Sequence, residues 1–242
     1  MKDILGIPMV GHCYFRSKLS RALEGVYIAT CDKEIKEYCE SIGAPCIMTS
    51  NKHERASDRI AEAMLKIENE VKKTCEIVVL IQGDEPMLDP AMVDKLVSEL
   101  ENEPKINVAN GYRAISSIKD FEDPNEVKVV LDQYSNAIYF SREPIPSKKK
   151  WEGQVSMYKQ ICIMPFRRQF LLDFNSAPQG NLEKIESIDM LRVLEMGKKV
   201  KMVPMENDSF SVDTRSDLSR VRKLMANDSL VSIYNYKTNW RK

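Results

Sequence analysis

Short apolar runs alternate with helical patterns along the first half of the chain. Residues 26–30, 45–48 and 77–81 form compact apolar runs that are typical of buried strands. The spacing of apolar residues predicts helices over residues 32–42 and 57–71, and a third helix begins near residue 90. Because strands alternate with helices, we expect an α/β fold built on a doubly wound, mostly parallel sheet.

Capping residues mark where several helices begin and end. Asp32 stands at an expected N-cap, and Gly43 follows the same helix, where a left-handed residue is favoured. Pro90 suits the first turn of the third helix. Thr214, followed three residues later by Asp217, predicts a capping box and a helix to about residue 225.

The second half of the chain has more closely spaced strands. We expect strands over residues 106–114, 127–132, 137–141, 160–164 and 200–204. The strands at 127–132 and 137–141 are expected to form a hairpin. Helices are expected over residues 167–175 and 185–196. This change of character predicts a sheet domain of residues 1–118 and 182–227, with a smaller α+β lobe of residues 119–181 inserted into it. Beyond residue 227 the pattern weakens, so we expect residues 228–242 to form a loose tail.

Charge and composition narrow the classes of function. The chain has 36 Lys and Arg residues and 36 Asp and Glu residues, so no global field favours nucleic acid or an anionic membrane. No segment approaches the roughly 18 apolar residues of a membrane span, and the N-terminus lacks a secretory h-region, so we expect a cytoplasmic protein. The six cysteines include no CxxC pair and the only histidines are His12 and His53, so we do not expect a Cys/His metal site.

Two aspartates are candidates for metal-dependent chemistry. Asp84 follows the strand at 77–81, where ligands bind in open α/β sheets, and Gly83 lets a ligand approach the backbone. Asp213 stands where a strand is expected to give way to the helix at Thr214. If both carboxylates face one crevice, they would share a Mg²⁺ ion, which prefers oxygen ligands. From the residues alone, both also remain compatible with ordinary turn carboxylates.

Several short motifs, in order along the chain, carry a resemblance to one family. Residues 82–86 read Gln-Gly-Asp-Glu-Pro. The other motifs are Asp-Ile-Leu-Gly-Ile-Pro-Met at 3–9, Ile-Ala-Thr at 28–30, Pro-Asn-Glu-Val-Lys-Val-Val at 124–130, Tyr-Phe-Ser-Arg at 139–142 with Ile-Pro at 145–146, Leu-Glu through Leu-Arg over 182–192, and Val-Asp-Thr at 212–214. Together they resemble the 3-deoxy-D-manno-octulosonate (Kdo) cytidylyltransferases, the CMP-Kdo synthetases.

The resemblance implies a nucleotide-diphospho-sugar transferase-like fold and a Mg²⁺-dependent enzyme that joins CTP to an acidic sugar. The products would be a CMP-sugar and pyrophosphate, for lipopolysaccharide or surface-polysaccharide synthesis. It also implies a homodimer, with the sheet domain binding nucleotide and the smaller lobe binding sugar and the partner copy. The matching residues are Asp84 and Asp213 for catalysis and the metal; Thr30, Asp32, Ser57, Arg59, Gln82 and Gly83 for the nucleotide; and Arg142, Gln160, Met164, Asp189 and Met190 for the sugar.

Departures from the family pattern bear on activity and substrate. The family's first strand and basic triphosphate-binding loop have no counterpart before Met1, so we expect an incomplete copy with weak or no turnover and poor stability. Gln160, Met164 and Met190 stand where His, Tyr and Gln are usual, and Asp189 replaces Glu. Because thioethers cannot replace lost hydrogen bonds, we expect a modified Kdo acceptor or relaxed specificity. The alternatives are a nucleotidyltransferase for another acidic sugar, such as a sialic-type acid, and a non-catalytic relative that lost its triphosphate-binding loop.

Overall fold

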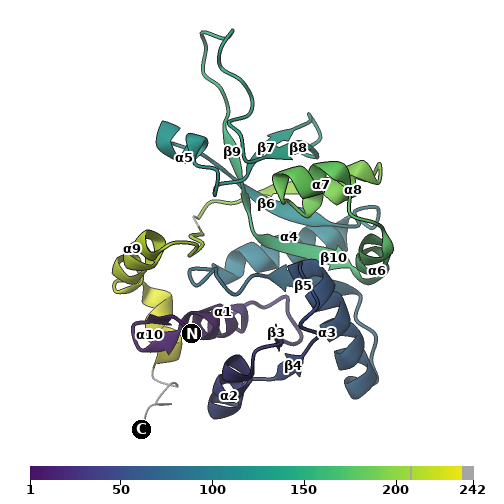
Figure 1. Ribbon diagram of the computed structural model, residues 1–242, viewed down its shortest axis with the longest axis vertical. Coiled ribbons are helices and arrows are strands. Elements are labelled where there is room, and N and C mark those ends of the chain that lie inside the picture. Colours follow the sequence, from purple (N-terminus) through teal and green to yellow (C-terminus); the bar gives the residue numbers. More distant parts are fainter. Residues whose placement is uncertain (208, 236–242) are drawn as a thin grey trace. The chain divides into compact units, whose positions relative to one another are not determined.

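The computed structural model describes residues 1–207 and 209–235 (Figure 1). The chain divides into two compact units. Unit 1 contains the described residues of Met1–Cys75, Leu80–Lys95 and Ser209–Lys242, and unit 2 contains those of Glu76–Val79 and Leu96–Asp208. These bounds differ from the lobe expected at residues 119–181. The assignment of nucleotide and sugar roles to separate domains stays a prediction.

Unit 1 begins with an antiparallel pair, β1 (Asp3–Ile4) and β2 (Ile7–Pro8), followed by α1 (Met9–Ser17). β3 (Ile28–Thr30) and β4 (Cys46–Met48) pair in parallel; α2 (Lys33–Ile42) connects them, and α3 (Ala56–Val71) follows β4. Both expected caps of α2 are confirmed, since Asp32 accepts from the amide of Glu34 at 2.8 Å and Gly43 has a φ of 65°. This strand–helix–strand unit brings the carboxyl ends of β3 and β4 to one edge, where ligands bind in such folds.

The C-terminal helices belong to the core of unit 1. Thr214 and Asp217 form the expected capping box at the start of α9 (Arg215–Met225). The expected loose tail is wrong for the segment that forms α10 (Ser229–Asn235), and residues 236–242 lie outside the described residues. Val231 and Tyr234 of α10 are buried in one cluster with apolar residues of β1, β2 and α9. Burial of apolar surface therefore orders a helix whose own sequence pattern is weak.

Among the described residues, unit 2 is built on a five-stranded mixed sheet in the order β11-β6-β9-β7-β8. Its strands are β6 (Ala109–Ala114), β7 (Lys128–Leu131), β8 (Ala137–Ser141), β9 (Tyr158–Ile161) and β11 (Lys201–Pro204). β11 runs parallel to β6, and the other neighbours are antiparallel, including the expected hairpin β7–β8. β10 (Ile163–Arg167) pairs instead with β5 (Ile77–Ile81).

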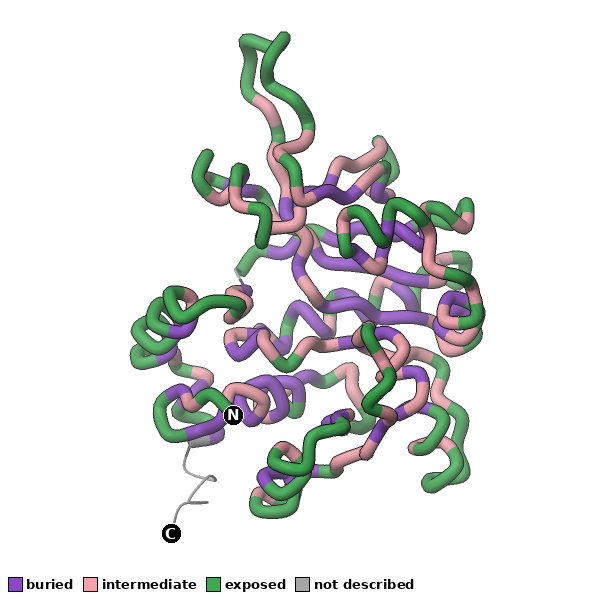
Figure 2. The backbone as a smooth tube through the Cα atoms, viewed as in Figure 1, coloured by how far each residue is buried: buried purple, intermediate pink, exposed green. Residues whose placement is uncertain are grey.

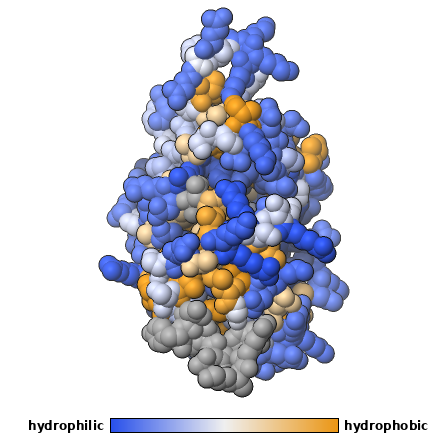
Figure 3. All heavy atoms as spheres, turned by 90° about the vertical axis from the view of Figure 1, so that its left-hand side faces the viewer, coloured by the Kyte–Doolittle hydropathy of each residue, from blue (hydrophilic) through white to orange (hydrophobic). Residues whose placement is uncertain are grey.

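The helices of unit 2 are α5 (Ile118–Glu122), α6 (Arg168–Ser176), α7 (Asn181–Glu186) and α8 (Met190–Glu195), and α4 (Pro90–Asn102) has residues in both units. Figure 2 shows buried residues along the central strands and mainly exposed residues along the loop from β8 to β9. On the face drawn in Figure 3, hydrophilic side chains predominate and apolar side chains form separate groups. Within the described part of the chain, no helix combines the length and the apolar character that crossing a membrane requires.

Two expected elements are divided in the structure, and one is absent. The strand expected over residues 160–164 is two strands, β9 and β10, separated at Cys162 where the pairing partner changes. The helix expected over residues 185–196 is α7 and α8, because Ser187 ends α7 with a left-handed φ of 55°. Residues 211–213, expected as the end of a strand, form none. Apolar spacing continues across both breaks, so periodicity alone does not reveal them.

Candidate functional site

Asp84 lies in the loop after β5, as the sequence predicts. Its Oδ1 atom is buried and has no hydrogen-bond partner among the described residues, although the residue as a whole is only half-buried. The carbonyl oxygen of Asp84 accepts from the amide of Val212 at 3.0 Å. Because Asp213 is the next residue, this bond holds two acidic residues from distant parts of the chain in neighbouring positions within unit 1.

The surroundings of Asp84 disfavour its charged form. Burial raises the pKa of the Asp84 carboxyl, and the negative charge of Asp213 adds to the increase. Asp213 is exposed, and its Oδ2 accepts from the hydroxyl of Ser211 at 3.1 Å. A divalent cation would pair with the buried oxygen and offset the repulsion between the carboxylates. Since carboxylate oxygens are the ligands that Mg²⁺ prefers, the residues present fit a hard cation.

The number of protein ligands at this pair also suits Mg²⁺. Within the described ranges, no group of three or more His, Cys, Asp and Glu side chains is arranged to hold a metal ion. Mg²⁺ commonly binds through one or two carboxylates and completes its shell with phosphate oxygens and water. Asp84 and Asp213 therefore match a metal that binds together with a phosphate-containing substrate.

Side chains that the sequence analysis did not single out hold the Asp84 loop. Cys13 of α1 donates from Sγ to the carbonyl oxygen of Gly83 at 3.3 Å, and burial raises the pKa of this thiol, which keeps the proton on sulfur. Ser209 donates to the carboxylate of Glu85, and both side chains are buried. Glu85 belongs to the motif at residues 82–86, whereas nothing in the sequence pattern distinguishes Cys13 or Ser209.

Arg16 links the same loop to the C-terminal helix. Its side chain is almost fully buried, and Nη1 donates to the carbonyl oxygen of Leu88 at 3.1 Å. Its Nη2 pairs with Asp228, and its Nε donates to the hydroxyl of Tyr234 at 3.3 Å. The same hydroxyl lies 2.8 Å from Nδ1 of His12. A buried network centred on one arginine therefore joins the Asp84 loop, α1 and α10.

Three of the expected nucleotide residues meet at the carboxyl ends of β3 and β4. The carbonyl oxygen of Thr30 accepts from the amide of Thr49 at 2.8 Å. Arg59 of α3 donates to Oγ1 of Thr49 at 2.5 Å and to the carbonyl oxygen of Ser50 at 3.2 Å. The hydroxyl of Thr30 accepts from the amide of Asp32 at 3.0 Å. The structure thus groups Thr30, Asp32 and Arg59 and adds Thr49, which the sequence analysis missed.

The other expected nucleotide residues are Ser57, Gln82 and Gly83. Ser57 is buried near the start of α3, and Gln82 is half-buried after β5. Gly83 is exposed, and the nearest atom to a Cβ at this position would be Cγ2 of Val10 at 4.0 Å. The backbone next to Asp84 is therefore open enough for a ligand to approach closely.

Arg142, the expected contact of the sugar carboxylate, lies just after β8 in unit 2. Its Nε donates to the carbonyl oxygen of Glu186 at 2.7 Å, its Nη1 to that of Pro124 at 2.9 Å and its Nη2 to that of Ser187 at 3.3 Å. A guanidinium has five N–H groups. Three of the five are therefore used by backbone carbonyls, which fix the orientation of the group.

The other expected sugar residues also belong to unit 2. Gln160 of β9 donates to Oδ1 of Asn110 at 2.5 Å and lies 3.9 Å from Sδ of Met164 on β10. Asn110, which the sequence analysis missed, is fully buried and holds β9 and β10 together through the carbonyls of residues 161 and 163. Met164 and Met190 are both buried, and half-buried Asp189 is the N-cap of α8.

The candidate residues therefore divide between the two units. The expected metal and nucleotide residues are in unit 1, and the expected sugar residues are in unit 2. Within unit 1 the structure joins Asp84 to the neighbour of Asp213. Within unit 2 it joins Gln160 to Met164 and links Arg142 to the turn that precedes Asp189 and Met190.

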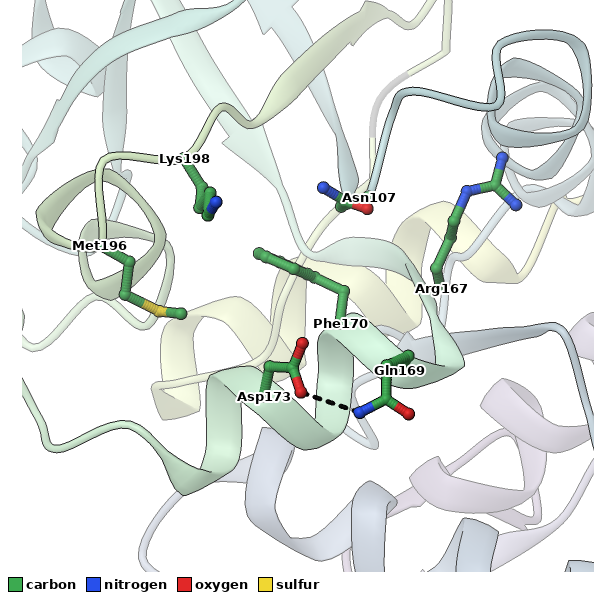
Figure 4. Close-up of a pocket in the computed structure, with 7 residues that line it drawn as sticks. All are labelled: Asn107, Arg167, Gln169, Phe170, Asp173, Met196 and Lys198. Atoms are coloured by element: carbon green, nitrogen blue, oxygen red, sulfur yellow. Dashed lines mark hydrogen bonds between the residues drawn. The ribbon is translucent and has the colours of Figure 1, made fainter.

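A hollow of about 250 Å³ in unit 2 involves different residues (Figure 4). Phe170 and Asp173 of α6 line it together with Lys198, and Nε2 of Gln169 donates to Oδ1 of Asp173 at 2.9 Å. None of the expected sugar residues is among the residues that line it. We therefore assign no substrate to this hollow.

Comparison with known proteins gives a consistent result. The profile of the family described as cytidylyltransferase matches residues 1–200. The chain is 36% identical to the 3-deoxy-manno-octulosonate cytidylyltransferase of Geobacter sulfurreducens over 231 residues, covering 91% of this chain and 90% of that protein. It is 40% identical to the protein of the same name from Thermodesulfovibrio yellowstonii over 225 residues, covering 90% of this chain and 88% of that protein.

Solved structures resemble this chain over most of its length. A CMP:2-keto-3-deoxy-manno-octonic acid synthetase complexed with CTP has a TM-score of 0.85 at 34% identity, covering 93% of this chain and 90% of that one. A putative glucose-1-phosphate thymidylyltransferase from Bacillus anthracis has a TM-score of 0.65 at 14% identity, covering 94% of this chain and 86% of that one. These neighbours confirm the α/β fold of the nucleotide-diphospho-sugar transferase type that the sequence predicts.

Proposed function

Because the chain belongs to the 3-deoxy-manno-octulosonate cytidylyltransferase family, we propose that it activates a Kdo-type sugar acid with CTP. The products are the CMP-sugar and pyrophosphate, and the product serves lipopolysaccharide or surface-polysaccharide synthesis. One structural observation supports the proposal: the buried Oδ1 atom of Asp84, near Asp213, has no hydrogen-bond partner in the part of the chain that the structure describes. Such a pair suits a cation that is shared with a nucleotide.

The reaction forms one P–O bond and breaks another. The anomeric hydroxyl oxygen of the sugar attacks the α-phosphorus of CTP, its proton passes to solvent, and pyrophosphate leaves in line. Charge builds on the phosphoryl oxygens, so positioning and electrostatic stabilisation supply most of the catalysis. In this chain Asp84 and Asp213 would hold Mg²⁺, which when bound neutralises charge at the α-phosphate.

The nucleotide residues act by binding and orientation. Thr30, Asp32, Ser57 and Arg59 would contact the nucleotide near the ends of β3 and β4, and Gln82 and Gly83 would do so beside Asp84. The contacts of Arg59 with Thr49 and Ser50 support this role, because they hold a guanidinium at the strand edge where ligands bind.

The sugar residues would bind the acceptor through a carboxylate and a partly apolar surface. The remaining N–H groups of Arg142 suit a carboxylate, because a planar guanidinium offers paired donors. Asp189, Gln160 and the thioethers of Met164 and Met190 would contact the rest of the sugar. The amide nitrogen of Gln160 already donates to Asn110, which leaves fewer donors for acceptor hydroxyls. This supports an acceptor that is a modified Kdo, or relaxed specificity.

Two further features complete the proposal. We infer that the enzyme is a homodimer, which sedimentation at several protein concentrations tests directly. We also assign the reaction to the cytoplasm. All six cysteines lie within the described ranges and no disulfide joins them there, as is usual for proteins of a reducing compartment.

Pyrophosphate release and CMP-sugar formation test the proposed function. The chain is incubated with CTP, Kdo and MgCl₂, with parallel reactions that contain a chelator, omit the sugar or replace CTP with UTP. We expect product only with CTP, the sugar acid and the metal together. A parallel reaction with a sialic acid in place of Kdo tests the alternative that the chain activates another acidic sugar. Binding of CTP or Kdo without any transfer would overturn the transferase and favour the non-catalytic relative.

A further inference from the structure

Glu186, the last residue of α7, joins this helix to β8 through an unusually complete set of contacts. Its Oε1 accepts from the hydroxyl of Ser141 at 2.7 Å and from that of Tyr139 at 3.4 Å. Its Oε2 accepts from the backbone amide of Arg142 at 2.8 Å. In return, Nε of Arg142 donates to the carbonyl oxygen of Glu186 at 2.7 Å. The two residues therefore hold each other through both backbone and side-chain atoms.

These contacts determine the path of the chain after α7. Ser187 adopts a left-handed φ of 55°, which is unfavourable for a residue with a side chain, and its carbonyl oxygen accepts from Nη2 of Arg142 at 3.3 Å. The turn separates α7 from α8, which begins with Asp189 as N-cap and Met190 as first residue. Two expected sugar residues thus follow directly from a turn that Glu186 and Arg142 hold.

The guanidinium of Arg142 is fixed from a second side. Its Nη1 donates to the carbonyl oxygen of Pro124 at 2.9 Å. The same segment is held by Lys128, whose Nζ donates to the carbonyl oxygen of Asp123 at 2.7 Å, and by Lys159, which pairs with Glu126 at 3.0 Å. Arg142 therefore connects the segment before β7 to the turn after α7, while the Glu186 carboxylate holds the backbone amide of the same arginine.

We propose that Glu186 is a positioning residue of the sugar-acid site, acting through Arg142 and the turn at Ser187. The inference rests on the proposed function, because the sugar roles of Arg142, Asp189 and Met190 belong to that proposal. Loss of the carboxylate frees the amide of Arg142, loosens the turn and lets the guanidinium reorient. Sugar-acid affinity then falls, whereas the CTP contacts in unit 1 do not depend on Glu186.

Glu186→Ala and Glu186→Gln test the proposal, with Glu195→Gln as the matched control. The Glu195 carboxylate also binds α7, but at its other end, where it accepts from the amides of Leu182 at 3.0 Å and Glu183 at 3.2 Å. Isothermal titration measures the affinity for Kdo and, separately, for CTP with Mg²⁺, and thermal unfolding reports stability. These readouts do not require turnover.

We expect Glu186→Ala to weaken Kdo binding by about tenfold or more, the effect of losing an orienting contact, with CTP affinity unchanged. Glu186→Gln keeps one acceptor oxygen, so its effect should be intermediate. Glu195→Gln should lower stability without changing Kdo affinity. Equal losses of affinity for Kdo and for CTP would mean that Glu186 only stabilises the helix. Equal losses of Kdo affinity in Glu186→Gln and Glu195→Gln would mean the same. If the unaltered chain binds CTP but not Kdo, the assignment of the sugar residues fails and the inference fails with it. If the unaltered chain binds Kdo and Glu186→Ala binds it equally well, only this inference is overturned.

Discussion

The amide of Val212 donates to the carbonyl oxygen of Asp84 at 3.0 Å, and this bond helps to hold the loop after β5 against the segment that leads into α9. Asp213, next to Val212, thereby contributes to the raised pKa of the Asp84 carboxyl. Two carboxylates held near each other cost stability while both are charged. The same arrangement would provide oxygen ligands for the proposed divalent cation, which would offset this cost to the metal-free protein.

Asp84→Asn should therefore raise the melting temperature of the metal-free protein while lowering the transfer rate on the order of 10² or more. The sign follows from the raised pKa: folding favours the protonated carboxyl, so at neutral pH the charged form opposes folding. Thermal unfolding with and without MgCl₂ measures both effects, since Mg²⁺ should stabilise the unaltered protein and not the variant.

Asp213→Asn is the paired comparison for this prediction. Asp213 is exposed, so removing its charge should stabilise the metal-free protein less than the change at Asp84 does. It should nevertheless weaken the thermal response to Mg²⁺. A full Mg²⁺ response in both variants would contradict the proposed metal site.

The buried His12 predicts a loss of stability in mild acid. Burial lowers its pKa from the ordinary value of 6.5 to about 4, and the nearby charge of Arg16 adds to the decrease, although the bond with the carbonyl of Ile4 opposes it. As the pH falls below 6.5, His12 becomes protonated in the unfolded chain, whereas in the folded protein it becomes protonated only near pH 4. Between about pH 8 and about pH 5 we expect a loss of about 2 kcal/mol in the free energy of unfolding.

Urea unfolding of the unaltered protein and of His12→Gln at these two pH values isolates the effect. The difference between the two proteins should shrink as the pH falls, because the glutamine does not titrate. An unchanged difference would mean that His12 takes up its proton at the same pH in the folded and the unfolded protein, and that the contacts of its two ring nitrogens with Tyr234 and Ile4 must be reinterpreted.

Tyr234→Phe tests whether α10 is part of the core. Tyr234 is buried, and its hydroxyl lies between Nε of Arg16 and Nδ1 of His12. Removing the hydroxyl leaves two buried groups without this partner, so we expect a loss of about 1–3 kcal/mol by chemical denaturation. A loss close to zero would mean that the hydroxyl contacts of Tyr234 with Arg16 and His12 do not contribute to stability.

The buried ion pair of Glu183 and Arg192 predicts strong coupling. Arg192 binds both carboxylate oxygens at 2.6 Å, and the two side chains are 3% exposed or less. Arg192→Met removes the guanidinium that binds both oxygens of a buried carboxylate and should cost about 3–5 kcal/mol, whereas the double variant with Glu183→Leu should be less destabilised than Arg192→Met alone. Denaturant unfolding of the unaltered protein, the two single variants and the double variant gives the coupling energy. Additive changes in the free energy of unfolding would contradict the pairing.

Local signals were sufficient where a few neighbouring residues decide the structure. Asp32 and Gly43 bound α2, and Thr214 with Asp217 starts α9, because capping satisfies backbone groups within one turn of chain. The β7–β8 hairpin is local in the same sense. The break at Ser187 has no such signal, since its left-handed backbone is held by Arg142, far away in sequence.

The candidate site shows the same division. The motif at residues 82–86 directs attention to Asp84, and its position after β5 follows from the strand pattern. The side chains that hold the Asp84 loop could not be predicted from the sequence. Cys13, Ser209 and Arg16 contact the loop from distant parts of the sequence, and these residue types are common in ordinary cores and surfaces.

By itself the sequence determined the alternation of strands and helices from β3 to α4, the capped ends of α2 and α9, and the family to which the chain belongs. These depend on periodicity, local hydrogen bonding and short motifs, which one stretch of chain contains in full. Only the tertiary structure decided that the amide of Val212 meets Asp84, that Glu186 and Arg142 hold each other, and that α10 is buried. Each of these depends on contacts between distant segments, whose free energy comes from desolvation and close packing in the folded state.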